Sequence, residues 1–352
     1  MIKDPDTGEP NGWLLEDLGG RILRFFPRGG LEETMKEVRR MSRDLNAVGI
    51  TGVIQQLGGT TTGRNFRALE QLRKEGELTL RWRLNYSLPP ATPDDRIQEA
   101  IGNLGPPTGY GNEWLRIGGL GELSLDGWWE PMDTAYLREP YEGSYSRQQG
   151  KGDLDEVLNV YDEVDQLYPI ASKRWTLEHG GFLPTPRNLE QAKRLGVIVS
   201  TQQSISYFVP RALREMLGER RASSLFPNRT WLEGGIMVAG GSDFPGSPLS
   251  PLLGMYASVT RKTAIGELGP EEAISRQEAL KLYTTYAAHI SFEEDLKGSI
   301  EPGKLADFVV LSDDLLTVPE EQIKVELTRF RGHLILREKG AHDAKKLSKV
   351  PT

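Results

Sequence analysis

The chain has 352 residues, of which 38% are hydrophobic and 26% charged, and its net charge is −7. This composition is typical of a soluble protein with one large domain or two ordinary ones, and it argues against the basic surface of a nucleic-acid-binding protein. The absence of cysteine excludes disulfides, zinc-thiolate sites and thiol nucleophiles, so a metal would need histidine, carboxylate or modified-lysine ligands, and only four histidines are present.

The hydropathy of the chain predicts a cytoplasmic protein. Its first twelve residues, MIKDPDTGEPNG, are polar and contain no apolar signal-sequence core. No window approaches the 18 apolar residues that a membrane helix requires. We therefore expect neither a nucleic acid nor a membrane among its partners.

The first half of the chain alternates between helical and strand-like segments. Residues 31–48 place apolar side chains at helical spacing, and residues 49–57 form a strand-like apolar run. The same rhythm predicts helices at 64–75 and 93–104 and strands at 78–88 and 114–127.

The second half repeats this alternation. Its pattern predicts helices at 154–167, 188–195, 271–275 and 276–290 and strands at 174–179, 196–203 and 236–243. Strands that alternate with helices imply a parallel sheet, and six or seven such units favour a TIM-type (β/α) barrel over an open sheet.

The C-terminal part breaks the rhythm. Residues 305–311 and 325–337 are strand-like with no helix between them, which predicts a small β layer beside the barrel. We therefore expect an α/β barrel domain over 1–300 and the β layer over 301–337. The polar and basic residues 338–352 are expected to form a flexible tail.

Three polar residues stand at or near the ends of predicted strands, where TIM-type barrels carry their active sites: Glu122, His179 and Asp243. Imidazole and carboxylate groups are suitable ligands for Zn²⁺ or Mn²⁺. Such a cation would lower the pKa of water and polarise a carbonyl, with Asp243 as the general base. Each residue also has a structural interpretation: a turn or helix cap for Asp243, a buried hydrogen-bonded His179, and an ion-paired or exposed Glu122.

Further polar and aromatic residues are candidates for a substrate pocket. The pairs Gln55–Gln56 and Gln202–Gln203 end their strands, and Trp128 follows Glu122 closely enough to wall an apolar site. Arg81 could bind a substrate carboxylate, or it could pair with an acidic residue inside the fold.

Two segments carry a resemblance to a known family: residues 240–262, which begin GGSDFPGSPLSPLLG, and residues 278–319, which include GSIEPGKLADFVVL. They resemble the amidohydrolase superfamily, in its formamide-deformylase-like and exoenzyme-regulator-like branch of metal-dependent hydrolases. The resemblance covers about 5–319. It implies a (β/α) barrel joined to a composite β-sandwich, of which the C-terminal β layer would be a remnant, and hydrolysis of carbon–nitrogen bonds other than peptide bonds.

The resemblance also implies a ligand set. Asp243 matches the aspartate of the family's last barrel strand, His179 matches the histidine of strand six, and Glu122 matches the position between the two metals. The family's HxH pair is absent, which implies that the first barrel strand is missing, and Gln149 stands where the strand-five histidine would be. This set predicts one zinc or manganese ion at most.

Two functional hypotheses follow. In the first, the chain hydrolyses a small amide, formamide or urea-like substrate with metal-activated water and Asp243 as general base. In the second, it is an inactive or truncated homologue that binds no metal and has a binding or regulatory role. A two-carboxylate hydrolase such as a glycosidase is a weaker alternative, because the family segments argue against it. A missing barrel strand would expose strand edges, which makes pairing with a partner chain or a homo-oligomer a further expectation.

Overall fold

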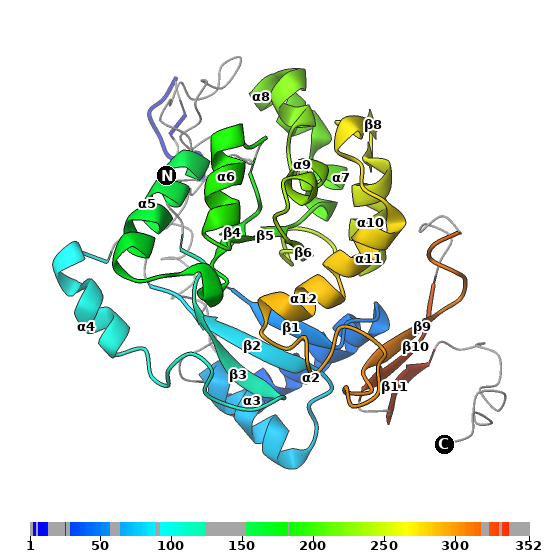
Figure 1. Ribbon diagram of the computed structural model, residues 1–352. Helices are drawn as coiled ribbons and strands as arrows, with labels where there is room; N and C mark the ends of the chain where they lie inside the picture. Colours follow the sequence, from blue (N-terminus) through cyan, green and yellow to red (C-terminus); the bar gives the residue numbers. More distant parts are fainter. Residues whose placement is uncertain are drawn as a thin grey trace.

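A computed structural model describes the fold. The described residues are 3–4, 6–12, 25, 29–56, 64–88, 92–123, 153–181, 183–317, 324–330 and 333–337. Within them the chain forms two three-stranded parallel sheets, a three-stranded antiparallel sheet, a short hairpin and the surrounding helices (Figure 1). None of the helices in this part of the chain has the length and apolar character needed to cross a membrane.

The first parallel sheet has the strand order β1-β2-β3, with β1 at Gly52–Gln55, β2 at Arg81–Tyr86 and β3 at Leu115–Leu120. The helices on one of its faces are α2 (Leu31–Ala47) and α3 (Arg64–Glu75), and α4 (Ile97–Gly102) precedes β3. Trp82 and Leu84 of β2 pack with Met35, Leu69 and Leu72 of these helices. Because side chains alternate along a strand, Arg81, Arg83 and Asn85 point to the opposite, inner face.

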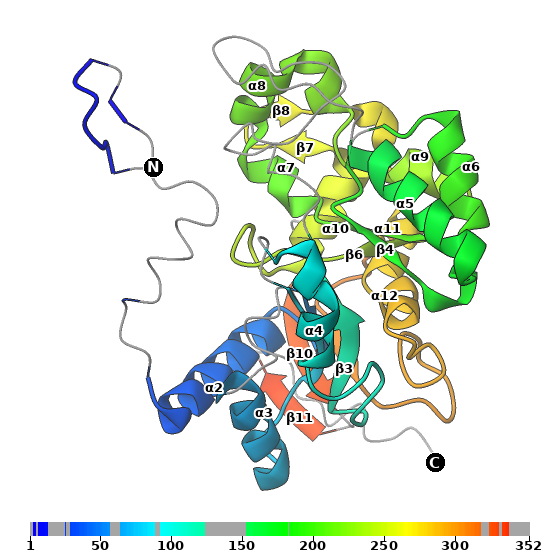
Figure 2. The same ribbon diagram turned by 90° about the vertical axis from the view of Figure 1, so that its left-hand side faces the viewer.

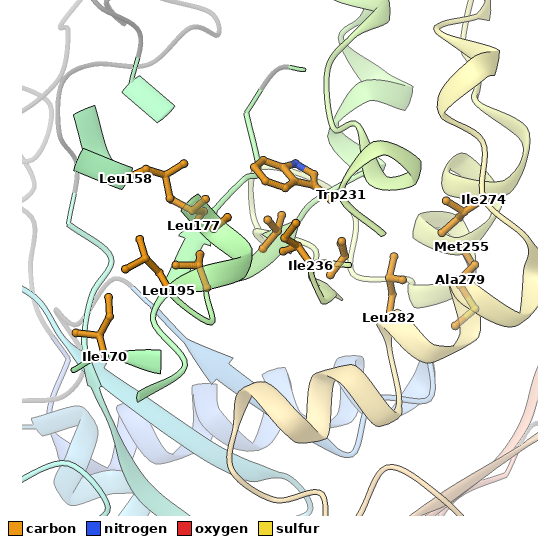
Figure 3. Packing of buried hydrophobic residues seen from close by; sticks show 14 of the residues in the cluster. Leu158, Ile170, Leu177, Leu195, Trp231, Ile236, Met255, Ile274, Ala279 and Leu282 are labelled. Atoms are coloured by element: carbon orange, nitrogen blue, oxygen red, sulfur yellow. The ribbon is translucent and has the colours of Figure 1, made fainter. Parts of the chain in front are cut away.

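The second parallel sheet has the order β4-β5-β6, with β4 at Thr176–Glu178, β5 at Ile198–Thr201 and β6 at Val238–Gly240. Its helices include α5 (Asp153–Leu167), α6 (Pro186–Arg194), α9 (Asn228–Glu233) and α10 (Pro251–Thr260). The core cluster between sheet and helices includes Leu158, Leu177 and Trp231 (Figure 3). Leu177 therefore points toward the helices, and its neighbours Thr176 and Glu178 face inward.

Two regions differ from the sequence-based prediction. The predicted helix over 276–290 is two short helices, α11 (Arg276–Leu282) and α12 (Thr285–Ile290), because the backbone leaves the helical region at Thr284. The break accompanies the packing of the Tyr283 ring against Gly240 and Gly254, a contact between distant segments that helical periodicity does not encode. The predicted helix at 271–275 is a single 3-10 turn at Pro270–Glu272.

The sequence pattern predicts no element between residues 203 and 236, the segment that joins β5 to β6. It contains α7 (Ser204–Phe208) and α8 (Pro210–Ser223) before α9. A hairpin of β7 (Lys262–Thr263) and β8 (Gly266–Glu267) follows α10.

The C-terminal strands β9 (Phe308–Leu311), β10 (Val325–Phe330) and β11 (His333–Arg337) form an antiparallel sheet in the order β11-β10-β9. The Thr328 hydroxyl donates to the carbonyl oxygen of Asn46 at 2.8 Å, which ties this sheet to the end of α2. In both views the first parallel sheet lies beside α2, α3 and β9–β11. The second parallel sheet lies beside α5 to α10 (Figures 1 and 2).

The parallel α/β architecture predicted from the sequence is confirmed. Among the described strands, β3 is not paired with β4, and β6 is not paired with β1. The six parallel strands described therefore form two separate arcs and not a closed ring.

Charged side chains occupy the inner face of the first sheet over the N-terminal half of β2. The Arg81 guanidinium donates to both carboxylate oxygens of Asp307, at 2.5 and 3.0 Å, and these side chains are 0% and 2% exposed. Arg83 forms an ion pair with Glu293, and Lys297 lies 2.8 Å from the same carboxylate. These ion pairs attach the segment that follows α12 to β2.

Lys297 should make the stability of the fold depend on pH. Burial, the largest cause, lowers the pKa of Lys297 from 10.5 to about 7; Arg83 and Arg81 act in the same direction and Asp307 opposes them. Between these two values the unfolded chain binds the proton and the folded chain releases it, so the free energy of unfolding should rise with pH above about 7.

The Lys297→Met variant should lack this contribution. Urea denaturation at pH 7, 8 and 9 should show a rise in unfolding free energy that is about 1–2 kcal/mol smaller in the variant than in the parent. Lys262→Met, which removes an exposed lysine of the β7–β8 hairpin, is the matched control and should keep the parent's pH dependence. Equal pH dependence in the parent and the Lys297 variant would show that Lys297 keeps its proton in the fold.

Candidate active site

The structure brings together predicted site residues from both parallel sheets. His179 directly follows β4, Glu122 follows β3, and Asp243 follows β6. The His179 Nε2 atom lies 3.5 Å from Oε1 of Glu122. The carboxyl ends of β3 and β4 thus meet at this point, although the two strands belong to different sheets.

The backbone is unusual at two of these residues. The φ angle is 66° at His179 and 53° at Asp243. Residues other than glycine rarely adopt this left-handed conformation, and aspartate and histidine tolerate it better than most. It costs on the order of 1–3 kcal/mol and is found most often at functional sites. Both residues were singled out from the sequence, and four other described residues share this conformation: Arg174, Phe226, Arg261 and Phe292.

A layer of polar side chains lies directly beneath the strand ends. Oε1 of Glu178 accepts hydrogen bonds from Gln56 Nε2 at 2.7 Å and from the Thr176 hydroxyl at 3.0 Å. Asn85 Nδ2 in turn donates to Gln56 Oε1. Sequence reasoning missed Glu178, although its alternation with the core residue Leu177 predicts that it faces inward.

The site carries an excess of negative charge. Burial lowers the pKa of His179, but the hydrogen bond with Glu122 and the charges of Glu122 and Asp243 outweigh burial, so the net pKa is raised. Burial raises the pKa of Asp243, and Glu122 adds to this effect while His179 opposes it. Burial likewise raises the pKa of Glu178. Three carboxyl groups around one imidazole favour a bound cation.

The donor types fit a single divalent cation such as zinc. In the described ranges, however, no three histidine, cysteine, aspartate or glutamate side chains are close enough together to hold a metal ion. The described arrangement is a close pair, His179 and Glu122, with the Asp243 carboxylate near enough to affect the pKa of His179.

A cavity of about 1140 Å³ adjoins these residues. Its polar wall includes Glu122, Glu178, His179, Gln202 and Asp243. Much of the remaining wall is apolar and comes from α2, β1, α10, α12 and β9, for example Val38, Met41, Val53, Leu252, Met255, Ile290 and Leu311.

Three of the predicted pocket residues, Gln55, Gln56 and Gln202, line the cavity, and Gln202 is the most informative of them. It is 5% exposed, and its Nε2 donates to the Ser200 hydroxyl at 3.0 Å. Its Oε1 atom has no hydrogen-bond partner among the described residues. A buried acceptor without a partner is suited to a donor group on a substrate.

Two predicted pocket residues lie away from the cavity. The guanidinium of Arg81 is held by Asp307 in the buried ion pair described above, and Gln203 Oε1 accepts hydrogen bonds from Asn228 and Arg261. Gln149 and Trp128 lie outside the described residues.

Comparisons with known proteins extend the resemblance seen in the sequence. The amidohydrolase family model matches residues 1–335. The putative amidohydrolase YtcJ of Bacillus subtilis (strain 168) is 26% identical over 375 residues, which cover 95% of this chain and 67% of YtcJ. An N-substituted formamide deformylase of Arthrobacter pascens is 33% identical over 163 residues, which cover 46% of this chain and 30% of the deformylase.

A solved structure gives the corresponding result for the fold. The crystal structure of an uncharacterized metal-dependent hydrolase from Pyrococcus horikoshii OT3 superposes with a TM-score of 0.69 at 23% sequence identity, over 91% of this chain and 67% of that one. The comparisons therefore place the chain among hydrolases with a barrel-like α/β fold. Because the family match extends over residues 1–335 of the 352, the chain belongs to the amidohydrolase family.

Proposed function

We propose that the protein is a metal-dependent hydrolase of carbon–nitrogen bonds other than peptide bonds, acting on a small amide, formamide or urea-like substrate. The observation that supports this most directly is the meeting of His179 and Glu122 at the ends of β4 and β3, with Asp243 nearby and a cavity beside them. The relatives named as an amidohydrolase and a formamide deformylase support the same reaction class.

In this proposal Glu122, His179 and Asp243 would hold one zinc or manganese ion. When bound, such an ion polarises the substrate carbonyl and makes water more acidic. Asp243 is the general base: burial raises its pKa, which brings a carboxylate closer to the range in which it both accepts and releases a proton. It takes a proton from the attacking water and passes it to the departing amine.

The remaining wall of the cavity orients the substrate. Oε1 of Gln202 is placed to accept a hydrogen bond from the substrate N–H group, since it has no other acceptor role among the described residues. The apolar wall suits a neutral substituent on the carbonyl or on the nitrogen, because burial of apolar surface is favourable and a charge would lose its hydration there.

A second candidate is a homologue without catalytic activity that has a binding or regulatory role. It is favoured by the lack of a three-ligand group within the described part of the chain. The sequence supports it as well, because no HxH pair is present and Gln149 replaces a histidine that the family resemblance implies.

Metal content separates these two candidates. We expect the purified chain, supplemented with zinc or manganese and then freed of excess metal, to retain close to one equivalent by elemental mass spectrometry. His179→Ala and Asp243→Ala should lose it, because each removes a ligand from a set of three. His289→Ala, which removes the α12 histidine that lies 3.2 Å from Glu294, should retain it. A parent chain that binds no metal would favour the second candidate.

A further inference from the structure

We propose that Gln56 is a positioning residue for His179 and acts through the carboxylate of Glu178. This inference rests on the proposed function, in which His179 is a metal ligand. Neither Gln56 nor Glu178 is part of the ligand set that the sequence and the family resemblance predict. Both line the cavity next to His179.

The backbone conformation of His179 requires that the residues before it and the residues after it are both held in place. Its φ angle of 66° is uncommon for a residue other than glycine. Such a conformation persists where the surrounding structure fixes the neighbouring residues. If the backbone relaxed, the imidazole would turn away from Glu122, which lies 3.5 Å from its Nε2 atom.

The C-terminal side of His179 is held by the core. The carbonyl oxygen of Gly180 accepts a hydrogen bond from Trp231 Nε1 at 3.2 Å, and that of Gly181 accepts one from the Phe226 N–H at 3.1 Å. Trp231 is 0% exposed and packs inside the cluster between the second sheet and its helices (Figure 3). This half of the support comes from α9 and the residues just before it, which pack on the sheet that carries His179.

The N-terminal side is held from across the two sheets. Oε1 of Glu178 accepts from Gln56 Nε2 at 2.7 Å, and Gln56 directly follows β1 of the first sheet. Asn85 of β2 donates to Gln56 Oε1 and so fixes which end of the Gln56 amide points to Glu178. The Thr176 hydroxyl also reaches Glu178, but it lies on the same strand and cannot fix that strand against the first sheet.

The position of the bridge explains why it would matter. The first sheet carries Glu122 at the end of β3, and the second carries His179 at the end of β4. β3 and β4 are not paired with each other in the described fold. The Gln56–Glu178 hydrogen bond joins the end of β1 to β4 and is therefore placed to set the spacing between the two sheets that bring these ligands together.

Histidine ring NMR of the metal-free protein at one fixed pH tests the proposal. The chain has four histidines, so the ring signals can be assigned by single substitutions. Gln56→Leu, which removes both amide contacts at similar size, should shift or broaden the His179 signal and leave the His289 signal in place. The matched control is Gln71→Leu, the same substitution in α3 outside the cavity, where the Gln71 amide donates to Glu75; it should leave both signals in place.

Metal binding gives the second measurement. Gln56→Leu should weaken metal affinity by about 10–100-fold, the usual effect of losing a group that orients a ligand. The double variant Gln56→Glu with Glu178→Gln exchanges donor and acceptor across the bridge and should restore both the His179 signal and the affinity.

The outcomes separate positioning from mere stabilisation. A Gln56→Leu protein that melts at a lower temperature but keeps the parent His179 signal would overturn the proposal, as would a double variant that folds without restoring that signal. The NMR measurement needs neither metal nor turnover. A parent chain that binds no metal would therefore count against the proposed function, while the His179 signal would still decide whether Gln56 positions this ring.

Discussion

The Asp307→Ala variant should have a free energy of unfolding that is lower than that of the parent by about 3–5 kcal/mol. The Arg81 side chain is 0% exposed, and two of its N–H groups donate to the Asp307 carboxylate. Removal of the carboxylate leaves a guanidinium buried without its counterion, and the cost of desolvating that charge is no longer offset. The effect should appear as a lower urea midpoint with an unchanged denaturant slope.

Two companion variants make this result specific. Asp313→Ala removes an exposed aspartate of the turn after β9 and should change the unfolding free energy by no more than about 0.5 kcal/mol. The double variant Arg81→Met with Asp307→Leu removes both charges and should recover most of the loss, because apolar residues of similar size can replace a buried ion pair. A loss below about 1 kcal/mol in Asp307→Ala would show that water reaches Arg81.

This ion pair also explains how the chain is organised around the site. Arg81 and Asp307 are 226 positions apart, so their contact joins β2 to the segment that leads into the C-terminal sheet. Arg83, Glu293 and Lys297 make a second connection of the same kind. Typical barrel interiors are filled with branched apolar side chains. Here the inner face of β2 carries charges instead, and their partners come from the segment that follows α12.

The sequence was sufficient where local pattern decides the structure. The apolar spacing over 31–48 predicted a helix, and α2 spans Leu31–Ala47. The run over 236–243 predicted a strand followed by a polar end, and β6 ends at Gly240, shortly before Asp243. In the TIM-type barrel that the sequence predicts, the carboxyl ends of all strands lie on one face, which is why His179 and Glu122 could be expected to lie close together although β3 and β4 belong to different sheets.

Distant contacts decided the features that the sequence did not predict. The helical pattern over 276–290 continues through the residues where the helix breaks, and the break coincides with the packing of Tyr283 against glycines of β6 and α10, which the pattern does not encode. The role of Glu178 depends on Gln56, a residue 122 positions away in another sheet. Arg81 had two interpretations because alternation gives the face of a strand but does not say which acidic residue reaches it.

A second large effect should come from Asp243→Asn, which in the proposed function lowers kcat/KM for a small amide, formamide or urea-like substrate by about 10²–10⁴-fold. The amide has the shape of the carboxylate and keeps a carbonyl oxygen, but it cannot take up a proton from water. Asparagine also tolerates the left-handed backbone at this position, where φ is 53°, so the fold should persist where alanine would add strain.

Comparison of the two substitutions at this position separates the roles assigned to Asp243. Asp243→Ala removes both the ligand oxygen and the base, whereas Asp243→Asn keeps an oxygen donor, so the asparagine variant should retain more metal than the alanine variant while losing activity to a similar extent. Asp313→Asn, at an exposed position outside the cavity, should keep parent activity. If Asp243→Asn retained activity within tenfold of the parent, the proton would have to be taken by another group. Glu178 would then be the first to substitute, because it is a carboxyl group on the cavity wall whose pKa burial also raises.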